Sequence, residues 1–426
     1  MKGLMQDHSL LISSVIRYAA ANHGQRQIAS RDPDGQVHYT NYAEVEGRSR
    51  RLALALTNFG IRQGDRAATL AFNTFRHLEC FYGISGMGAI LHTVNPRLFG
   101  DQIAYILNHG ENRVLLFDPC LMPLVESIAP QLKTIEKFIV LSKRPSIPAP
   151  AACASLCYED LIDNSADDFQ WPDLDERTAA SLCYTSGTTG EPKGVLYSHR
   201  STVLHALSTL QPDCFGLRAV DAVLPFVPMF HVHAWSTPYG CPMAGAKLVL
   251  PGHQLDARSL VELLHAQQVT LALGVPTVWS MLVTHLRDTG ESLPHLERAV
   301  IGGSALPSAI YKALEEDMAG AAGGGEGGQA DQDLDRGGGF QMGQGDLVTK
   351  KLDAVAAEHI ESVIPSEGQR QMAAIVERHE ARSSFCQAVD RSDHHTHQPG
   401  RRTAVSAAEA PAKAGQMDYA SEMQDV

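Results

Sequence analysis

The sequence predicts an α/β fold over about the first 318 of its 426 residues. In this part, short runs rich in β-branched residues alternate with longer amphipathic stretches, and strands separated by helices imply largely parallel sheets. The aromatic side chains that fill a large core also gather here, because residues 319–426 carry only Phe340, Phe385 and Tyr419. The candidate strands are Ala67–Phe72, Arg113–Phe117, Phe138–Leu141, Ala180–Tyr184, Ala222–Val227, Lys247–Leu250, Val269–Leu273 and Arg298–Ile301.

Helical patterns lie between these strands. Asn41 and Glu44 have the spacing of a capping box, an apolar face follows, and Gly60 is placed to end the helix. The apolar face has the helical spacing i, i+3, i+4, i+7. Its members are Leu52, Ala55, Leu56 and Phe59. Similar patterns predict helices over Asp256–Gln267 and Pro276–Leu286, and a further helix is expected over Ser308–Asp317.

Charge and apolar runs limit the class of protein. The net charge of −13 argues against a broad grip on nucleic acid, which needs an excess of Lys and Arg on one face. The most apolar long run, Phe81–Val94, is shorter than the ~18 residues that span a bilayer. Residues Met1–Ala20 lack the basic start and cleavage site of a signal peptide. The eight scattered cysteines are interpreted as free thiols of a cytoplasmic protein.

Residues 319–426 are interpreted as a low-order tail rich in Gly and Ala. Few large apolar side chains leave little to offset the entropy of ordering this segment. Two short helices are expected within Lys351–Arg382, on either side of Pro365. The histidines of His394–His397 could bind a metal. An exposed, solvated run is the favoured interpretation, because no Cys or carboxylate completes a tetrahedral set.

The residues with the clearest chemistry are in Tyr184–Gly194, directly after a candidate strand. Glycines let backbone N–H groups converge on an anion, Ser and Thr add hydroxyl donors, and Lys193 adds a positive charge. The segment is not a Walker A loop, because Pro192 stands where that pattern needs its second Gly. A flexible turn is the alternative, and the composition favours a phosphate loop. Gly83–Gly88 lacks the order of a dinucleotide fingerprint and is better explained by tight helix packing.

Five segments together resemble the AMP-forming acyl-CoA synthetases of the adenylate-forming superfamily. They occur in the family's order: His92–Leu98, Tyr184–Arg200, Pro228–Trp235, Gly274–Thr277 and Gly302–Pro307. The resemblance covers about residues 10–318. It is nearest to the medium- and long-chain fatty acyl-CoA ligases and the methylthiopropionate-CoA ligases. It implies the layered α/β/α subdomains of that family's large N-terminal domain, here incomplete.

The resemblance also implies a reaction and a set of ligands. In this family a carboxylate attacks the α-phosphate of ATP, giving acyl-AMP and pyrophosphate, and the CoA thiol then displaces AMP. Mg²⁺ and loop donors neutralise the anions. By the resemblance, Thr185 would lie by Mg²⁺ and His231 would sit beside the reacting carboxylate. The residues that would hold the β- and γ-phosphates are Ser186, Gly187, Thr188, Thr189, Gly190 and Lys193.

Further site residues follow from the same resemblance. Trp235 matches an aromatic residue that gates the acyl tunnel in some relatives, and simple core packing is an equal alternative. The remaining candidate acyl-wall residues are Val227, Val275 and Thr277, and those that would present backbone to adenine and carboxylate are Gly302, Gly303 and Ser304. His233, where relatives often carry Asn, is given no role. Trp279 and Cys183 are expected in the core.

The departure from the family begins near Met318. The family's Gly-Met-Thr-Glu motif, its ribose-binding Asp, its small C-terminal domain and the catalytic Lys of that domain are not found after it. A frameshift is the favoured explanation, and a fusion or an assembly error is the alternative. Two other functional hypotheses therefore remain: a truncated remnant with little or no ligase activity, and an adenylate-forming enzyme with a non-CoA acceptor. A homodimer is possible by analogy with relatives.

Overall fold

The computed structural model describes residues 5, 7–143, 155–185, 192–304, 310, 313 and 314. These all belong to Met1–Asp353, one of the two compact units into which the chain divides. The loop residues Ser186–Gly190, the expected helices within Lys351–Arg382 and the histidines of His394–His397 lie outside the described residues. Of the helix expected over Ser308–Asp317, only Ile310, Ala313 and Leu314 are described, and all three are helical.

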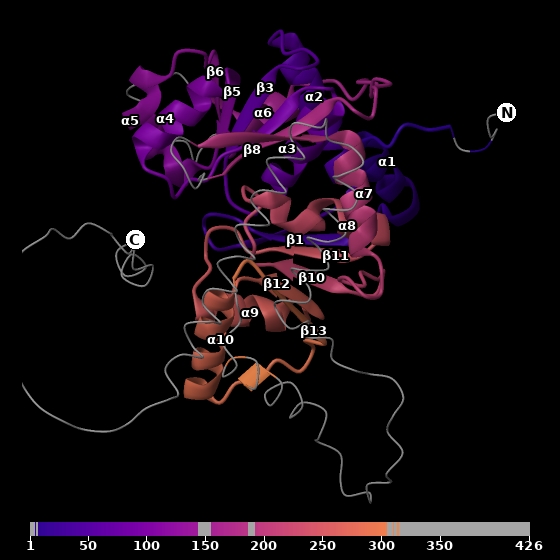
Figure 1. Ribbon diagram of the computed structural model, residues 1–426, viewed down its shortest axis with the longest axis vertical. Helices are drawn as coiled ribbons and strands as arrows, with labels where there is room; N and C mark the ends of the chain where they lie inside the picture. Colours follow the sequence, from indigo (N-terminus) through magenta and orange to yellow (C-terminus); the bar gives the residue numbers. More distant parts are fainter. Residues whose placement is uncertain are drawn as a thin grey trace, which may run out of the picture. The chain divides into compact units, whose positions relative to one another are not determined.

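One sheet has six strands in the order β13-β12-β10-β11-β1-β2 (Figure 1). Every neighbouring pair is parallel except β1 and β2, which are antiparallel. The strands are β1 (Gln27–Arg31), β2 (Val37–Asn41), β10 (Ala222–Pro225), β11 (Lys247–Leu250), β12 (Leu271–Gly274) and β13 (Arg298–Ile301).

The other sheet has seven strands in the order β7-β6-β5-β3-β4-β8-β9. It is parallel except for the final pair, β8 and β9. The strands are β3 (Arg66–Leu70), β4 (Ile90–Thr93), β5 (Asn112–Phe117), β6 (Lys137–Val140), β7 (Ser155–Cys157), β8 (Ala179–Thr185) and β9 (Lys193–Ser198). The two sheets contain all eight strands expected from the sequence, and the α/β prediction is confirmed.

Helices separate and cover the two sheets. They are α1 (Ile12–His23), α2 (Tyr42–Asn58), α3 (Phe75–Gly86), α4 (Gly100–His109), α5 (Met122–Ile128), α6 (Tyr158–Asp163), α7 (His199–Thr209), α8 (Thr237–Ala244), α9 (Ala257–Ala266) and α10 (Pro276–Thr289). Short 3₁₀ segments are η1 (Pro119–Leu121), η2 (Ala129–Gln131) and η4 (Val232–Ser236). No helix in the described ranges is both long and apolar enough to cross a membrane.

Helix α2 shows how local sequence sets the ends of these elements. The Asn41 side chain accepts the backbone N–H of Glu44, as expected for the N-cap. The Glu44 carboxylate returns to the Asn41 side-chain amide, and not to its backbone N–H as in a capping box. At the other end Gly60 has φ +80°, and the N–H groups of Gly60 and Ile61 donate to the carbonyls of Thr57 and Leu56. This is a Schellman motif, which confirms Gly60 as the stop.

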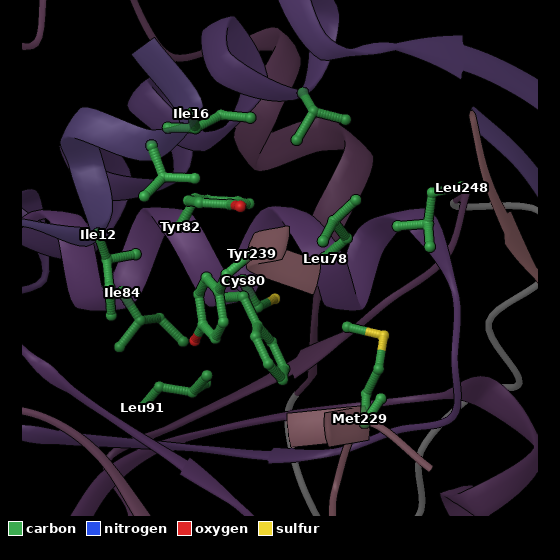
Figure 2. Packing of buried hydrophobic residues seen from close by; sticks show 14 of the residues in the cluster. Ile12, Ile16, Leu78, Cys80, Tyr82, Ile84, Leu91, Met229, Tyr239 and Leu248 are labelled. Atoms are coloured by element: carbon green, nitrogen blue, oxygen red, sulfur yellow. The ribbon is translucent and has the colours of Figure 1, made fainter. Parts of the chain in front are cut away.

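The largest core cluster lies between the two sheets, around α3 (Figure 2). Every residue of α3 is buried. A Cβ at Gly83 would come within 2.9 Å of the Ser49 carbonyl oxygen of α2, and one at Gly86 within 2.4 Å of the Trp171 ring. Gly83 and Gly86 therefore allow α3 to approach its neighbours closely, which confirms tight helix packing as the reason for these two glycines.

Two further clusters cover the outer faces. Residues of α9 and α10 pack on the six-stranded sheet, and residues of α4 and α5 pack on the seven-stranded sheet. Trp279 of α10 is fully buried in the first of these, and Cys183 of β8 is also buried, as expected. The result is helix, sheet, helix, sheet and helix in layers, and the expectation of a layered α/β fold is confirmed.

A buried ionic cluster ties α2, α3 and α6 together. The Glu79 carboxylate is completely inaccessible to solvent, lies 2.6 Å from Arg48 Nε and accepts the Tyr158 hydroxyl at 2.7 Å. Arg48 and Arg76 both contact Glu159, at 3.0 and 2.6 Å. Burial raises the pKa of Glu79, and its bonds to Arg48 and Tyr158 oppose that rise. Each buried charge therefore depends on its partners for compensation.

Candidate functional site

Several predicted site residues meet at the carboxyl edge of the six-stranded sheet. Strands β10, β12 and β13 are parallel neighbours, so Val227, Val275 and Gly302 follow them at the same edge. The Val227 N–H donates to the Leu273 carbonyl at 3.3 Å, and the Gly302 N–H donates to the Gly274 carbonyl at 3.4 Å. Ligands of open α/β sheets bind outside this edge.

Gly302 and Gly303 let the backbone at this edge lie close to Trp235 and Val275. A Cβ at Gly302 would come within 3.2 Å of the Trp235 ring, and one at Gly303 within 3.3 Å of Val275 Cγ1. Gly303 also has φ +86°, which disfavours any other residue. Gly303 and Ser304 are exposed, and Thr277 is exposed in the first turn of α10. The backbone here is accessible to a ligand.

Asn73, just before α3, holds the segment that enters the site, and the sequence analysis missed it. Its side-chain amide donates to the carbonyls of Pro225 and Val227 at 3.1 and 3.0 Å. Its side-chain oxygen accepts the N–H of Met229 at 2.6 Å. Asn73 precedes these partners by 152 or more residues, so no local pattern could have identified it.

The segment then makes a left-handed turn, defined here as Val232–Ser236. All five residues have φ between +46° and +63°, and none is glycine. Left-handed conformation costs L-residues roughly 1–2 kcal/mol each, so surrounding contacts must hold the turn. The Thr237 hydroxyl donates to the Ala234 carbonyl at 2.8 Å, and Ser236 Oγ lies 2.7 Å from His205 Nδ1.

His231 lies directly before this turn, and Trp235 is its fourth residue. His231 is exposed, and partial desolvation lowers the pKa of its imidazole. The ring is therefore largely neutral near pH 7 and can donate a hydrogen bond without carrying charge. Trp235 is partly buried against the central core while it faces Gly302. Trp235 thus contacts both the central core and the backbone at the sheet edge.

The predicted phosphate loop joins the ends of a two-stranded hairpin. Thr185, the last residue of β8, pairs with Lys193, the first residue of β9. Lys193 is exposed. The Tyr184 hydroxyl lies 2.5 Å from His109 Nδ1, and a Cβ at Gly194 would come within 3.2 Å of the Tyr184 ring. The hairpin therefore brings both flanks of the loop together from anchored strands.

Known proteins resemble the chain along this same stretch. Residues 16–327 match the family described as AMP-binding enzyme. A 3-methylmercaptopropionyl-CoA ligase of Ruegeria pomeroyi is 51% identical over 73% of this chain and 58% of its own length. A long-chain-fatty-acid–CoA ligase of Thermus thermophilus is 49% identical over 73% of this chain and 56% of its own. The chain thus spans under two thirds of the length of these relatives.

A solved structure agrees with the layered fold. An inhibitor-bound N-terminal domain of FACL13 from Mycobacterium tuberculosis covers 72% of this chain and 73% of that domain, with a TM-score of 0.62 and 26% identity. The order of motifs, the fold and the relatives agree. The chain belongs to the AMP-binding enzyme family, and its resemblance to medium- and long-chain acyl-CoA ligases is confirmed.

Proposed function

We propose that the site activates a carboxylic acid with ATP and transfers the acyl group to CoA. The carboxylate oxygen bonds to the α-phosphorus of ATP while the bond to pyrophosphate breaks, and the CoA thiol then displaces AMP from the acyl carbon. The observation that supports this most is the meeting of Val227, Val275 and Gly302 at one sheet edge, with the Trp235 ring beside it. Such an edge offers exposed backbone for a nucleotide and apolar walls for an acid.

The described residues have different chemical roles in this reaction. Lys193, at the exposed end of the hairpin, neutralises charge on the phosphates. His231 donates from its neutral ring to an oxygen where charge develops, at the carboxylate or the α-phosphate. Gly302 and Gly303 let backbone groups approach the adenine. The loop residues Ser186–Gly190 complete the phosphate site by family resemblance.

The acid is apolar along its chain. Val227, Val275 and Trp235 are the wall residues, and none carries a charge. Thr277 adds a hydroxyl at the start of α10. Relatives are named for a thioether acid and for long-chain fatty acids, and both have an apolar chain next to the carboxylate. The proposed substrate class is therefore a fatty or thioether carboxylic acid.

Mg²⁺ enters this proposal only through the family. No three His, Cys, Asp or Glu side chains gather as a metal site within the described ranges. Mg²⁺ bound together with a nucleotide would need few protein ligands and would supply positive charge, and Thr185 would be the candidate ligand.

A second candidate is a chain that binds the adenylate without completing the ligation. The change of composition after residue 318 favours it, because the family's ribose-binding Asp and catalytic Lys come later in relatives. Transfer of the acyl group to an acceptor other than CoA is a variant of the first candidate. Neither candidate requires a homodimer.

Two measurements separate these candidates. Pyrophosphate release is followed with ATP, Mg²⁺ and acids from butyrate to palmitate, together with 3-methylthiopropionate. Binding of a lauroyl-sulfamoyl-adenosine, which mimics the acyl-adenylate, is measured by calorimetry. Release and binding support the ligase, and binding without release supports the second candidate. Absence of both would overturn the proposal.

Variants test the residue assignments. We expect His231→Ala to lower turnover by about 10²-fold or more. Lys193→Ala should weaken ATP binding by about tenfold. Lys133→Ala, at an exposed lysine outside the site, is the matched control and should change neither. Equal effects of Lys193→Ala and Lys133→Ala would contradict the role of Lys193.

A further inference from the structure

The side chain of His233 links the left-handed turn to other elements of the fold. Its side chain is buried, whereas His231, two residues earlier, is exposed. The His233 ring packs edge-on against Phe81 of α3 and Tyr197 of β9, with ring centres 5.5 and 5.3 Å apart. These rings fix its orientation from two separate elements.

The polar end of His233 contacts the strand that leads into the predicted phosphate loop. Its Nε2 lies 3.4 Å from Cys183 Sγ, two residues before Thr185. Cys183 Sγ in turn lies 3.2 Å from Thr93 Oγ1, and the Thr93 hydroxyl donates to the Phe230 carbonyl at 3.2 Å. One order of protons satisfies all three contacts: His233 donates to Cys183, Cys183 to Thr93, and Thr93 to Phe230.

This chain of hydrogen bonds contacts the protein on both sides of His231 in the sequence. Phe230 and His233 flank the segment that carries His231, and both are tied to Cys183 and Thr93 on neighbouring strands β8 and β4. Burial lowers the pKa of His233 to about 3 and raises that of Cys183 to about 11. Both side chains are therefore neutral near pH 7, which does not suit a nucleophilic Cys–His pair.

We propose that His233 is a positioning residue that fixes the strained turn on β8, so that His231 and Trp235 face the acyl group of the adenylate. The inference rests on the proposed function. It assigns a role to a position where the sequence analysis gave none. Under the proposed function, the turn contributes the residues near the acyl group, whereas Lys193 and the loop contribute those near the phosphates. Loss of the anchor should therefore weaken binding of the acyl part and spare the nucleotide.

The experiment compares two probes, lauroyl-sulfamoyl-adenosine and AMP. His233→Phe keeps a buried ring and removes the N–H, and Cys183→Ala removes the acceptor. Each should weaken binding of the lauroyl probe by about tenfold and change AMP binding by less than about twofold. His233→Gln, which keeps an N–H at similar reach, should restore most of the affinity. Cys241→Ala, at another fully buried thiol, is the matched control and should change neither.

Coupling gives a stricter test. The double variant of His233→Phe with Cys183→Ala should bind the lauroyl probe no more weakly than either single variant, because both remove one interaction. Additive losses, or equal losses for AMP, would overturn the positioning role. If the unsubstituted protein binds neither probe, the proposed function fails first and this inference with it.

A measurement on the unsubstituted protein guards against variants that do not fold. Nitrogen-15 spectra of the histidine rings should show His233 neutral near pH 7 with its proton on Nε2, assigned by its absence in His233→Gln. A proton on Nδ1 would contradict the proposed order of hydrogen bonds.

Discussion

The buried carboxylate of Glu79 allows a quantitative test of the packing between α2, α3 and α6. Glu79→Ala removes a completely buried acceptor from Arg48 and from the Tyr158 hydroxyl. Arg48 keeps Glu159 as its one remaining carboxylate in the cluster, and the Tyr158 hydroxyl loses a bond whose loss costs about 1–3 kcal/mol. Breaking a buried ion pair on one side costs about 3–5 kcal/mol, so we expect the free energy of unfolding to fall by about that amount.

The assay is urea unfolding at pH 7, followed by far-ultraviolet circular dichroism. Glu262→Ala is the control, because Glu262 pairs with Arg258 on an exposed helix face, where such pairs contribute up to about 0.5 kcal/mol. A loss for Glu79→Ala within about 1 kcal/mol of the control would refute the view that the cluster compensates buried charge.

Three further predictions concern stability. Burial raises the pKa of Asp118 to about 7, so the folded state binds this proton more tightly than the unfolded chain. The contribution of Asp118 to the free energy of unfolding therefore falls as pH rises from about 4 to 7. Asp118→Asn should remove this fall, up to about 1.4 kcal/mol per pH unit, when unfolding by urea is measured across that range. Gly86→Ala should cost about 1–3 kcal/mol because its Cβ would meet the Trp171 ring, whereas Gly47→Ala in α2, where a Cβ meets nothing, should gain about 0.5–1 kcal/mol, both measured by urea unfolding. Asn41→Ala removes the cap of α2 and should lower the midpoint of thermal unfolding, at a cost of about 1 kcal/mol.

The sequence predicted strands well where their hydrophobic pattern differs from that of the neighbouring segments. It did not predict elements well where complete burial removes the alternation of apolar and polar residues. The eight expected strands are present, but β4 and α3 were not separated within Phe81–Val94. The reason is physical: every residue of α3 is buried, Arg76 and Glu79 included, so its polar residues do not mark a solvent-facing side. Strand β2 was also missed; it is an edge strand of five residues, of which one is buried and one is exposed, so its burial shows no clear alternation.

The candidate site residues were predicted from the resemblance to the family, and the topology explains why some of them come together. Residues after parallel neighbouring strands must meet at one edge, which is how Val227, Val275 and Gly302 come together. The left-handed turn was not predictable, since five non-glycine residues there contradict their intrinsic preferences. Contacts from distant elements override those preferences. Cys183 contacts His233, and Asn73 accepts the N–H of Met229 just before the turn.

The left-handed turn also matters to anyone who would engineer this protein. Ala234 has φ +47° and is fully buried at the centre of the turn. Glycine would relieve its backbone strain, so a selection for heat resistance alone would be drawn to glycine in this turn. The same change would make the backbone that orients His231 and Trp235 more flexible. Stability to heat would then rise while turnover falls. Selections should therefore score catalysis and heat resistance in the same round.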